Sequence, residues 1–598
     1  MAKLANTWPS APPHGLTATK KGNKISRLAE LQIWPFDCKT RFARRREPHR
    51  RKPKPVPDLP SAPGHWVLAA LIAPLTLAPA ASLANALPTT HGFMEIKLPV
   101  GSPAPVSGRL LLFAAPAPSG KLPDSVDADE FNPEQVTIAA QEISSLAPGG
   151  AAEIDTDADA YPNGFSALKP GAYGLQAVLD TRHDYAYAGR AAGDLISDVA
   201  LLTVGTATTH VPSLTLAHIV PESDPWQQPP RVPAKFHALV EAARPYVAAI
   251  EFQSPALTRF WGRPIMMRGW VLTPPTYAAQ STTRFPTVYY TNGFSGTRTS
   301  LLRPLAYVRA AEASGDLPPM IWVFLDQSSP TGTHEFADSV NNGPWGQAVT
   351  TELIPYLERQ YRMEAKPSER FLIGHSSGGW ATLWLQTSYP SFFGGTWSSS
   401  PDPSDFHDFL GTDIYAPHAN AYHRPDGTPT PLVRMNGKVV ASVEEVSSLE
   451  AVLGPSGGQM SSFDWVFSPR GPDGAPIPLF DRASGAVNPS VAAYWKANYD
   501  IANLVATRWP QLHGDLTGKI HVMVGDADTF YLDGPAHRLE TTLNTLHAGA
   551  KFTFVPGRGH FDLYVKGNDE FGRFKDVVWQ IYGTAKPNSP LRQPAAKQ

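Results

Sequence analysis

The sequence predicts an α/β protein in which helices cover both faces of a mostly parallel sheet, preceded by a small all-β domain of sandwich type. Helix-like and strand-like segments alternate from Lys235 to Tyr582, which is the pattern of parallel strands joined by helices. Ahead of them, from Gly92 to about Leu216, short apolar or alternating runs are separated by turn-rich segments. A length of 598 residues is several times that of a usual domain and favours two to four domains.

The first 86 residues form a basic head with the order of a secretory signal. They contain 14 Lys/Arg and 4 Asp/Glu, a net charge of +10, whereas the remainder contains 37 and 49, a net charge of −12. Residues 44–54 are dense in Arg and Lys, residues 67–81 are apolar and uncharged, and Ala84-Asn85-Ala86 supplies the small residues of a cleavage site. We therefore expect a basic disordered head plus signal peptide over residues 1–86, cleavage after Ala86, and a secreted or periplasmic protein.

Some features of the head leave alternatives open. Some sixty residues precede the apolar run, so either the true start codon lies further downstream or the head is a basic arm. An uncleaved membrane anchor is the rival interpretation, but Pro74 and Pro79 interrupt the run, which is shorter than the ~20 residues of a spanning helix. We expect no stable membrane span, and no nucleic-acid binding, because the arm lacks interleaved aromatic residues.

Cysteine usage excludes several kinds of chemistry. Cys38, in the head, is the only cysteine of the chain. A mature protein that begins after Ala86 therefore has no disulfide, no thiolate metal site and no cysteine nucleophile.

Turn and proline content divide the rest of the chain. The β domain is expected over residues 92–216, with strands near 93–98, 108–113 and 173–179, and is followed by a proline-containing linker over 217–233. The α/β domain follows over 234–585, and residues 590–598 form a disordered tail. Asp155, Asp157 and Asp159 alternate as in a calcium loop, but Ala160 stands where such a loop needs glycine. We therefore expect a solvated acidic turn and no metal site.

A strand-to-helix turn contains the candidate nucleophile. Gly374-His375-Ser376-Ser377-Gly378 lies between an apolar strand-like run and a helix-like stretch. In a G-x-S-x-G elbow the serine occupies a strained turn, and the glycines leave room for the strand and helix to approach each other. The pattern makes Ser376 the candidate nucleophile. The main-chain NH of Ser377, at the start of the helix, is a candidate oxyanion donor.

An elbow serine requires an acid and a histidine, which in this kind of fold follow it in that order. Residues 519–524 read as a buried parallel strand that ends in Gly525-Asp526-Ala527-Asp528. We favour Asp528 as the acid, because three residues after the glycine leave room for the turn. Asp526 is the first fallback, and Asp402, after the strand that follows the elbow, is the second.

The candidate base lies beyond a further helix and strand. A helix-like segment at 536–546 and a strand at 551–555 lead to Pro556-Gly557-Arg558-Gly559-His560. In this loop the imidazole of His560 can accept the serine proton with one nitrogen and donate to the aspartate with the other. His537 and His547 fall on or beside the preceding helix, where a surface histidine is the ordinary explanation.

A second oxyanion donor is expected after an earlier central strand. Residues 285–290 read as that strand, and Thr291-Asn292-Gly293-Phe294 follows it. Gly293 permits the turn, and the NH of Phe294 is the candidate donor. A plain Asn-Gly turn is the alternative interpretation.

Several short motifs carry a resemblance to a known family. They are Asn342-Gly343-Pro344-Trp345-Gly346, Glu352-Leu353-Ile354-Pro355-Tyr356, Tyr361-Arg362, the elbow, and Ser400-Pro401-Asp402-Pro403. In these the chain resembles the putative esterase family of α/β-hydrolases, which includes esterase D-like, feruloyl esterase-like and enterochelin esterase-like proteins. The likeness runs from about Ile265 to Tyr582. It departs from the family in a Pro/Gly/Ser-rich insertion over residues 404–491, expected to form a lid or acyl pocket.

The resemblance implies a serine carboxylesterase whose triad falls on Ser376, Asp528 and His560. Its substrate would be a small-molecule or polymer-linked ester, and the mechanism needs neither a metal nor an organic cofactor. Two alternatives remain: an acyltransferase that uses the same triad, and a non-catalytic binding protein on a hydrolase scaffold. The sequence does not identify the natural ester, the role of the β domain or the oligomeric state.

Overall fold

The computed structural model describes residues 91–595 apart from 119, 206–211, 223 and 228–231. The head, the expected cleavage site after Ala86 and Cys38 lie outside the described residues. No helix in the described ranges combines the length and the apolar character that crossing a bilayer requires. Residues 590–595 are described and contain neither helix nor strand.

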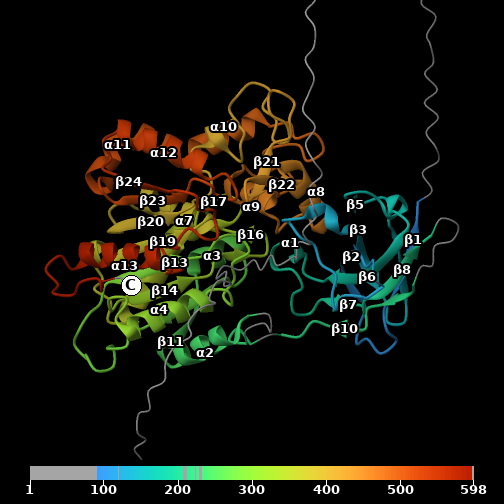
Figure 1. Cartoon of the computed structure of the whole chain (residues 1–598), viewed down its shortest axis with the longest axis horizontal. Coiled ribbons are helices and arrows are strands. Elements are labelled where there is room, and N and C mark those ends of the chain that lie inside the picture. Colours follow the sequence, from blue (N-terminus) through green and yellow to red (C-terminus); the bar gives the residue numbers. More distant parts are fainter. Residues whose placement is uncertain (1–90, 119, 206–211, 223, 228–231, 596–598) are drawn as a thin grey trace, which may run out of the picture.

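The N-terminal part, residues 91–219, is called the β domain below and consists of two sheets (Figure 1). The small sheet has the strand order β4-β1-β9, and the large sheet has the order β10-β7-β6-β2-β3-β5, with β8 paired to β6. The strands are β1 (Phe93–Lys97), β2 (Val106–Pro116), β3 (Thr137–Leu146), β4 (Ala151–Asp155), β5 (Ala160–Tyr161), β6 (Gly171–Asp180), β7 (Leu195–Ile196), β8 (Ala200–Val204), β9 (Leu214–Thr215) and β10 (His218–Ile219). A short helix, α1 (Tyr185–Ala188), follows β6. β10 falls in the segment expected as a linker, so the beginning of that segment is part of the sheet.

Strand β2 explains why the β domain is not an isolated sandwich. Its side chains alternate between the two faces of the sheet, as strand geometry dictates. Leu110 and Leu112 pack into the core shared with the small sheet. Leu111 and Phe113 face the other way and pack against Leu449 and neighbouring residues of helix α8 (Val443–Leu453) in the α/β domain. Both faces of the large sheet are therefore buried, which is why this strand is a continuous apolar run.

The α/β domain contains an eight-stranded sheet with the order β11-β12-β14-β13-β19-β20-β23-β24. Strand β12 pairs antiparallel with both of its neighbours, β11 and β14, and all pairs from β14 to β24 are parallel. The strands are β11 (Val247–Gln253), β12 (Met266–Leu272), β13 (Thr287–Thr291), β14 (Ile321–Leu325), β19 (Arg370–His375), β20 (Gly395–Ser399), β23 (Ile520–Gly525) and β24 (Lys551–Val555). Parallel strands bring their carboxyl ends to one edge of the sheet, where sites are commonly built.

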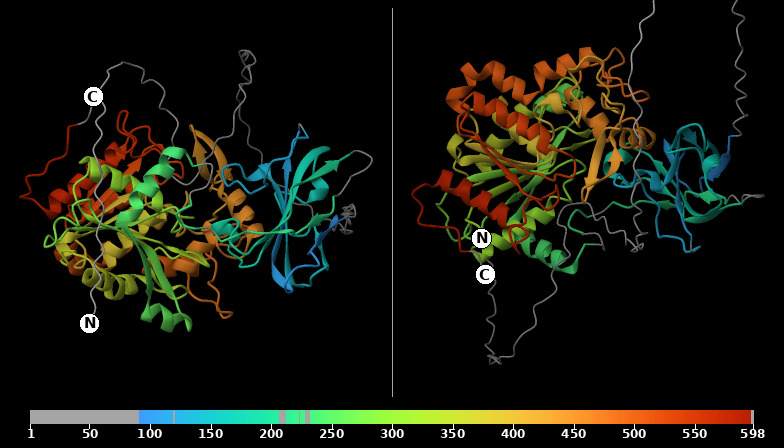
Figure 2. Two further views of the ribbon diagram at one scale, coloured as in Figure 1. Left: turned by 90° about the horizontal axis from the view of Figure 1, so that it is seen from below. Right: turned by 45° about the horizontal axis from the view of Figure 1, so that its top comes forward.

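Helices cover both faces of this sheet (Figure 2). Helices α2 (Ala234–Ala243), α4 (Leu302–Ser314) and α13 (Gly572–Ala585) pack on one face, around Trp322 and Phe371. The other face carries α3 (Pro255–Trp261), α5 (Trp345–Ala348), α6 (Ile354–Gln360), α7 (Ser377–Ser388), α11 (Ile501–Leu516) and α12 (Asp533–Thr545). A π-helical turn, Val349–Leu353, joins α5 and α6. Fold class and layer order agree with the prediction.

The insertion, residues 404–491, folds over the carboxyl edge of the sheet. It contains the hairpin β21 (Pro431–Met435) and β22 (Lys438–Ser442), the helices α8 (Val443–Leu453) and α9 (Gln459–Phe467), and the start of α10 (Pro489–Asn498). Two further hairpins lie between β14 and α5: β15 (Ser328–Ser329) with β16 (Gly332–Thr333), and β17 (Asp338–Ser339) with β18 (Gly343–Pro344). Helix α8 contacts β3 and β5, so the insertion lies between the eight-stranded sheet and the β domain (Figure 1).

Candidate active site

Ser376 lies at the turn between β19 and α7 in a conformation that few residues adopt. Its φ is +60° and its ψ is −128°, in the left-handed half of the map where a side chain is strained. A Cβ on Gly374 would lie 1.9 Å from the Gly378 carbonyl oxygen, and one on Gly378 would lie 2.3 Å from the Asn292 oxygen. Only glycine therefore allows this close approach of strand, helix and neighbouring loop, as the elbow motif requires.

His560 and Asp528 form a buried pair beside the elbow. His560 Nδ1 lies 2.9 Å from Asp528 Oδ2, and the two residues are 2% and 0% exposed. Burial alone raises the pKa of Asp528, but the charge and hydrogen bond of His560 outweigh it and hold that pKa below its usual value. The ionised carboxylate can only accept, so Nδ1 carries a proton, and in the neutral imidazole the lone pair is then on Nε2.

Ser376 and His560 line the same pocket. The hydrogen bond between Ser376 Oγ and His560 Nε2 is not formed among the described residues. Such a bond is often long in a free enzyme and shortens when the substrate binds. The structure thus places Ser376 and His560 around one pocket, with Asp528 hydrogen-bonded to His560.

The two fallback acids have other partners. Asp526 Oδ1 accepts a hydrogen bond from the Gly557 NH at 2.6 Å, and therefore supports the loop rather than the imidazole. Asp402 lies beneath the elbow, where its Oδ2 accepts from Ser377 Oγ at 2.6 Å. Burial raises the pKa of Asp402 to about 6, against the opposing effects of the Ser377 hydrogen bond and the His560 charge. Of the three aspartates, Asp528 alone is hydrogen-bonded to His560.

The expected oxyanion donors lie next to the serine. A Cβ on Gly293 would come within 2.8 Å of Ser376 Cβ, so the loop after β13 passes directly over the nucleophile. Phe294 follows it and lines the pocket. Within the described part of the chain, the main-chain NH groups of Phe294 and Ser377 donate to no other residue. Both are thus available to an oxygen atom in the pocket.

Polar contacts outside the expected motifs hold this oxyanion loop. Gln327 Nε2 donates to the main-chain oxygen of Asn292 at 2.5 Å, and Asn292 Nδ2 donates to Ser300 Oγ at 2.8 Å.

His375, which precedes Ser376 in the sequence, contacts Ser399 Oγ through Nδ1 at 3.1 Å. Burial, with a smaller effect of His560, lowers the pKa of His375 well below its usual value, so this imidazole is neutral.

The pocket that contains Ser376 has about 780 Å³ of space unfilled by atoms, including its mouth. Its lining is mainly apolar, with a few polar groups, as in binding sites for small molecules. The insertion contributes Leu410, Leu432 and Gln459. The β domain contributes Glu130 and Phe131, which sequence analysis did not select, because no local motif marks them. The remaining lining residues are Asn292, Gly293, Phe294, Gly296, His375, Ser376, Asp402, Phe530, Leu532, His560 and Phe561.

Possible metal ligands elsewhere are occupied by protein groups. Asp157, in the acidic turn of the β domain, accepts from the NH groups of Gly92 and Ser166. Asp405, His407 and Asp500 place ligand atoms within 4.8 Å of one another. The carboxylate of Asp500 already accepts from the Tyr415 hydroxyl and from main-chain NH groups, and Asp405 accepts from His407. These bonds account for both clusters without an ion.

The match to a known protein family falls within the α/β domain. The model of the family described as Putative esterase matches residues 265–567, just over half of the chain. No curated protein sequence matches the chain significantly.

Solved structures with similar architecture include three hydrolases. One is a ferulic acid esterase, at 14% identity and a TM-score of 0.34, over 57% of this chain and 97% of the other. The others are a fluorophosphonate-binding serine hydrolase of Staphylococcus aureus and an S-formylglutathione hydrolase from Agrobacterium tumefaciens. Their identities are 13% and 15%, and their TM-scores 0.35 and 0.34. They cover 56% and 57% of this chain, and 97% and 94% of the other.

Proposed function

The chain belongs to the Putative esterase family and is a hydrolase of ester bonds with an α/β-hydrolase fold, and from this premise we propose that Ser376, His560 and Asp528 are its catalytic triad. The observation that carries the proposal is the buried 2.9 Å bond between His560 Nδ1 and Asp528, since His560 lines the pocket that also contains the strained Ser376. That bond leaves Nε2 of His560 as the only basic nitrogen of the pair that faces a substrate.

The proposed reaction proceeds through an acyl-enzyme. His560 Nε2 removes the proton from Ser376 Oγ as the oxygen attacks the ester carbonyl, and the carbonyl oxygen becomes an oxyanion. The NH groups of Phe294 and Ser377 stabilise that charge. When the tetrahedral intermediate collapses, His560 returns the proton to the departing alcohol, and Ser376 remains acylated. A water molecule, deprotonated by His560, then releases the acid and restores the serine. No step uses a metal or an organic cofactor.

The positive charge of the first 86 residues, and the order in which their basic, apolar and small-residue segments follow one another, support a location outside the cytoplasm. The basic segment, apolar run and Ala-Asn-Ala site precede an acidic protein without cysteine. We therefore propose that the hydrolase is secreted or periplasmic. Its natural substrate would be a small-molecule or polymer-linked ester.

Turnover of an activated ester by the wild-type protein and by Ser376→Ala tests the triad. The wild type should hydrolyse the ester, and the variant should lose on the order of 10⁶ in kcat if the triad behaves as in subtilisin. Ser388→Ala, an exposed serine at the other end of α7, is the matched control and should keep full activity. A Ser376→Ala protein that retains more than about a tenth of wild-type turnover would contradict the assignment.

Product analysis separates hydrolysis from transfer to an alcohol. With sugar or glycerol acceptors present, a hydrolase releases mostly the free acid, whereas an acyltransferase releases mostly the new ester. Failure to turn over any ester, together with an intact fold, would instead favour a binding protein.

A further inference from the structure

The wall of the pocket opposite the elbow comes from the β domain. Glu130 and Phe131 belong to the loop between β2 and β3, and both line the pocket that contains Ser376. Phe131 is 9% exposed and is part of the hydrophobic core of the α/β domain. Its ring lies 6.2 Å from that of Phe530 and 5.9 Å from that of Phe561. These two residues lie next to Asp528 and His560 in the sequence, so the β domain reaches the immediate surroundings of the proposed triad.

The loop that carries Glu130 and Phe131 is held in place by its own domain. The Phe131 NH donates to Asp129 Oδ1 at 2.9 Å, and the Val126 NH donates to Gln176 Oε1 of β6 at 2.9 Å. The hydroxyl of Tyr185, in α1, donates to Asp127. Fixed side chains on both sides of a pocket bind a ligand at a lower entropic cost than mobile ones do.

The β domain is itself clamped to the insertion. Arg109 of β2 is 7% exposed, and its Nε and Nη2 donate to the Val452 oxygen of α8 at 3.0 and 2.8 Å. The same guanidinium pairs with Asp159 and Glu142 of the β domain. This buried contact and the apolar packing of α8 against the large sheet fix the distance between the loop and the pocket. The wall is therefore a permanent part of the site.

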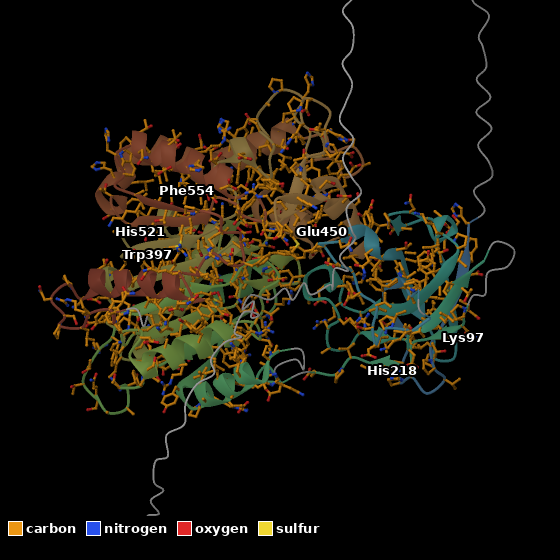
Figure 3. All side chains as sticks on the ribbon, viewed as in Figure 1. Lys97, His218, Trp397, Glu450, His521 and Phe554 are labelled. Atoms are coloured by element: carbon orange, nitrogen blue, oxygen red, sulfur yellow. The ribbon has the colours of Figure 1, made fainter. Side chains whose placement is uncertain are left out.

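The two wall residues differ in chemistry. Phe131 continues the apolar surface formed by Phe530 and Phe561, whereas Glu130 adds a carboxyl that makes no hydrogen bond to any described residue. Glu450, labelled in Figure 3 at the boundary between the two domains, is the carboxyl whose charge acts most strongly on it. Glu450 itself accepts from the NH groups of Gln459 and Met460. Burial, with the charges of Glu450 and Asp129, raises the pKa of Glu130 to about 8. The pocket thus contains a carboxyl group, that of Glu130, to which no described residue donates a hydrogen bond.

We propose, on the basis of the esterase activity proposed above, that Glu130 and Phe131 determine the substrate of the enzyme. The substrate is an ester with an apolar body, which packs against Phe131, and a hydrogen-bond donor beyond that body, which binds the Glu130 carboxyl. A hydroxyl and a protonated amine share this chemistry. A half-buried acceptor without a partner, in a pocket lined mainly by apolar groups, discriminates against an analogue that lacks the donor. In this proposal the β domain supplies the residues that select the substrate, and the α/β domain supplies the residues that react with it.

Matched esters test the proposal on the full chain. The 4-nitrophenyl esters of hexanoic, 6-hydroxyhexanoic and 6-aminohexanoic acid differ only at the end of the acyl chain. Hexyl, 6-hydroxyhexyl and 6-aminohexyl butyrates vary the alcohol instead, since either side of the ester can face the wall. The wild type should prefer a donor-bearing ester in one of the two series, as measured by kcat/KM. The hydroxyl and amine members distinguish a neutral donor from a cation.

Variants of the wall give the decisive comparison. Glu130→Leu, which removes both carboxyl oxygens, should lower kcat/KM for the preferred ester by about tenfold or more and leave the unsubstituted ester nearly unchanged. Phe131→Ala should raise KM for every member of the series. Glu134→Leu and Phe93→Ala change exposed residues of the same domain and are the matched controls. Glu130→Ala and thermal melting of each variant exclude a folding defect as the cause.

The outcomes separate this proposal from the catalytic one. If the wild type hydrolyses esters without favouring a donor, or if Glu130→Leu keeps the wild-type preference, the proposal is wrong and the triad is unaffected. If Ser376→Ala hydrolyses the esters as fast as the wild type does, the catalytic assignment itself fails.

Discussion

The hydroxyl of Tyr187 donates a 2.7 Å hydrogen bond to the main-chain oxygen of Gly296, which connects the β domain to the loop that carries the proposed oxyanion donor. Tyr187 is 6% exposed, and its ring meets that of Phe294 edge to face at 5.2 Å. The oxyanion loop is thus held from one side by the elbow and from the other by a different domain. A tyrosine more than a hundred residues away in the sequence acts on it as a positioning residue.

Tyr187→Phe should reduce kcat more than it changes KM. The variant keeps the ring contact with Phe294 but loses the hydrogen bond, so the loop becomes less well placed for the transition state. We expect a decrease in kcat of about tenfold in steady-state assays, with little change in Tm. Tyr173→Phe is the matched control, because that hydroxyl makes a similar 2.8 Å bond to the Lys169 oxygen far from the pocket. Equal activity of the two variants would show that the Tyr187 bond has no positioning role.

Gly293→Ala should abolish most activity without unfolding the protein. The new methyl group would lie 2.8 Å from Ser376 Cβ, closer than real contacts allow, and 3.3 Å from its Oγ, so either the loop or the serine must shift. Removing one oxyanion donor costs about 3 kcal/mol of transition-state stabilisation, or roughly a hundredfold in kcat. Gly514→Ala, in α11 with open space around it, serves as the control and should be neutral. Normal kcat in Gly293→Ala would remove this loop from the site.

Asp528→Asn and Asp526→Asn should differ by orders of magnitude in kcat. An amide at 528 presents an NH₂ group to His560 and favours the wrong tautomer, which in a serine protease lowers kcat by about 10⁴. Asp526 bonds only to the loop at Gly557, so its amide variant should keep most activity. Steady-state kinetics on the same ester decide between them. The reverse order would make Asp526 the acid of the triad.

The buried carboxyl of Glu312 should make the folding stability of the protein depend on pH. This residue of α4 is 7% exposed, and burial, despite hydrogen bonds from the Met320 NH and Trp322 Nε1, raises its pKa from 4.5 to about 8. The folded protein therefore binds this proton more tightly than the unfolded chain does. The resulting stabilisation is complete below about pH 4.5 and is lost as the pH rises through 8.

Glu312→Gln should remove this dependence, because the amide stays neutral and its oxygen keeps both hydrogen bonds. The Tm of the variant relative to the wild type should rise between pH 6 and pH 9, by a free energy of up to a few kcal/mol, since one pKa unit corresponds to about 1.4 kcal/mol. Glu134→Gln, at an exposed position, should show no such trend. Parallel Tm curves of Glu312→Gln and the wild type would contradict the shifted pKa.

Local signals were sufficient for the elements that build the elbow and the triad. Residues 551–555 were expected as a strand and form β24 with those bounds. The strand expected at 285–290 begins two residues later, because Pro286 has no NH to donate to the ladder. The helix expected at 536–546 begins earlier, at Asp533, since its first turn carries no apolar periodicity that would mark it. The residues within each of these segments are therefore enough to predict whether it forms a helix or a strand.

The part of the site that comes from the β domain could not be predicted in this way. Glu130, Phe131 and Tyr187 lie in turns and short helices without a catalytic motif. Their role depends on how the large sheet packs on α8, a contact between strands and a helix more than 300 residues apart. Non-local packing of this kind leaves no periodic signal, except that both faces of β2 are apolar. That feature is typical of a strand buried on both faces but does not identify its partner.

Mapping the adduct of a fluorophosphonate probe tests the central claim most directly. The probe reacts with a serine that a histidine activates and an oxyanion hole supports. Peptide mass spectrometry of the labelled wild-type protein should place the adduct on Ser376, and Ser376→Ala and His560→Ala should take up none. A protein that does not react, or an adduct that remains after Ser376→Ala, would contradict the proposed triad.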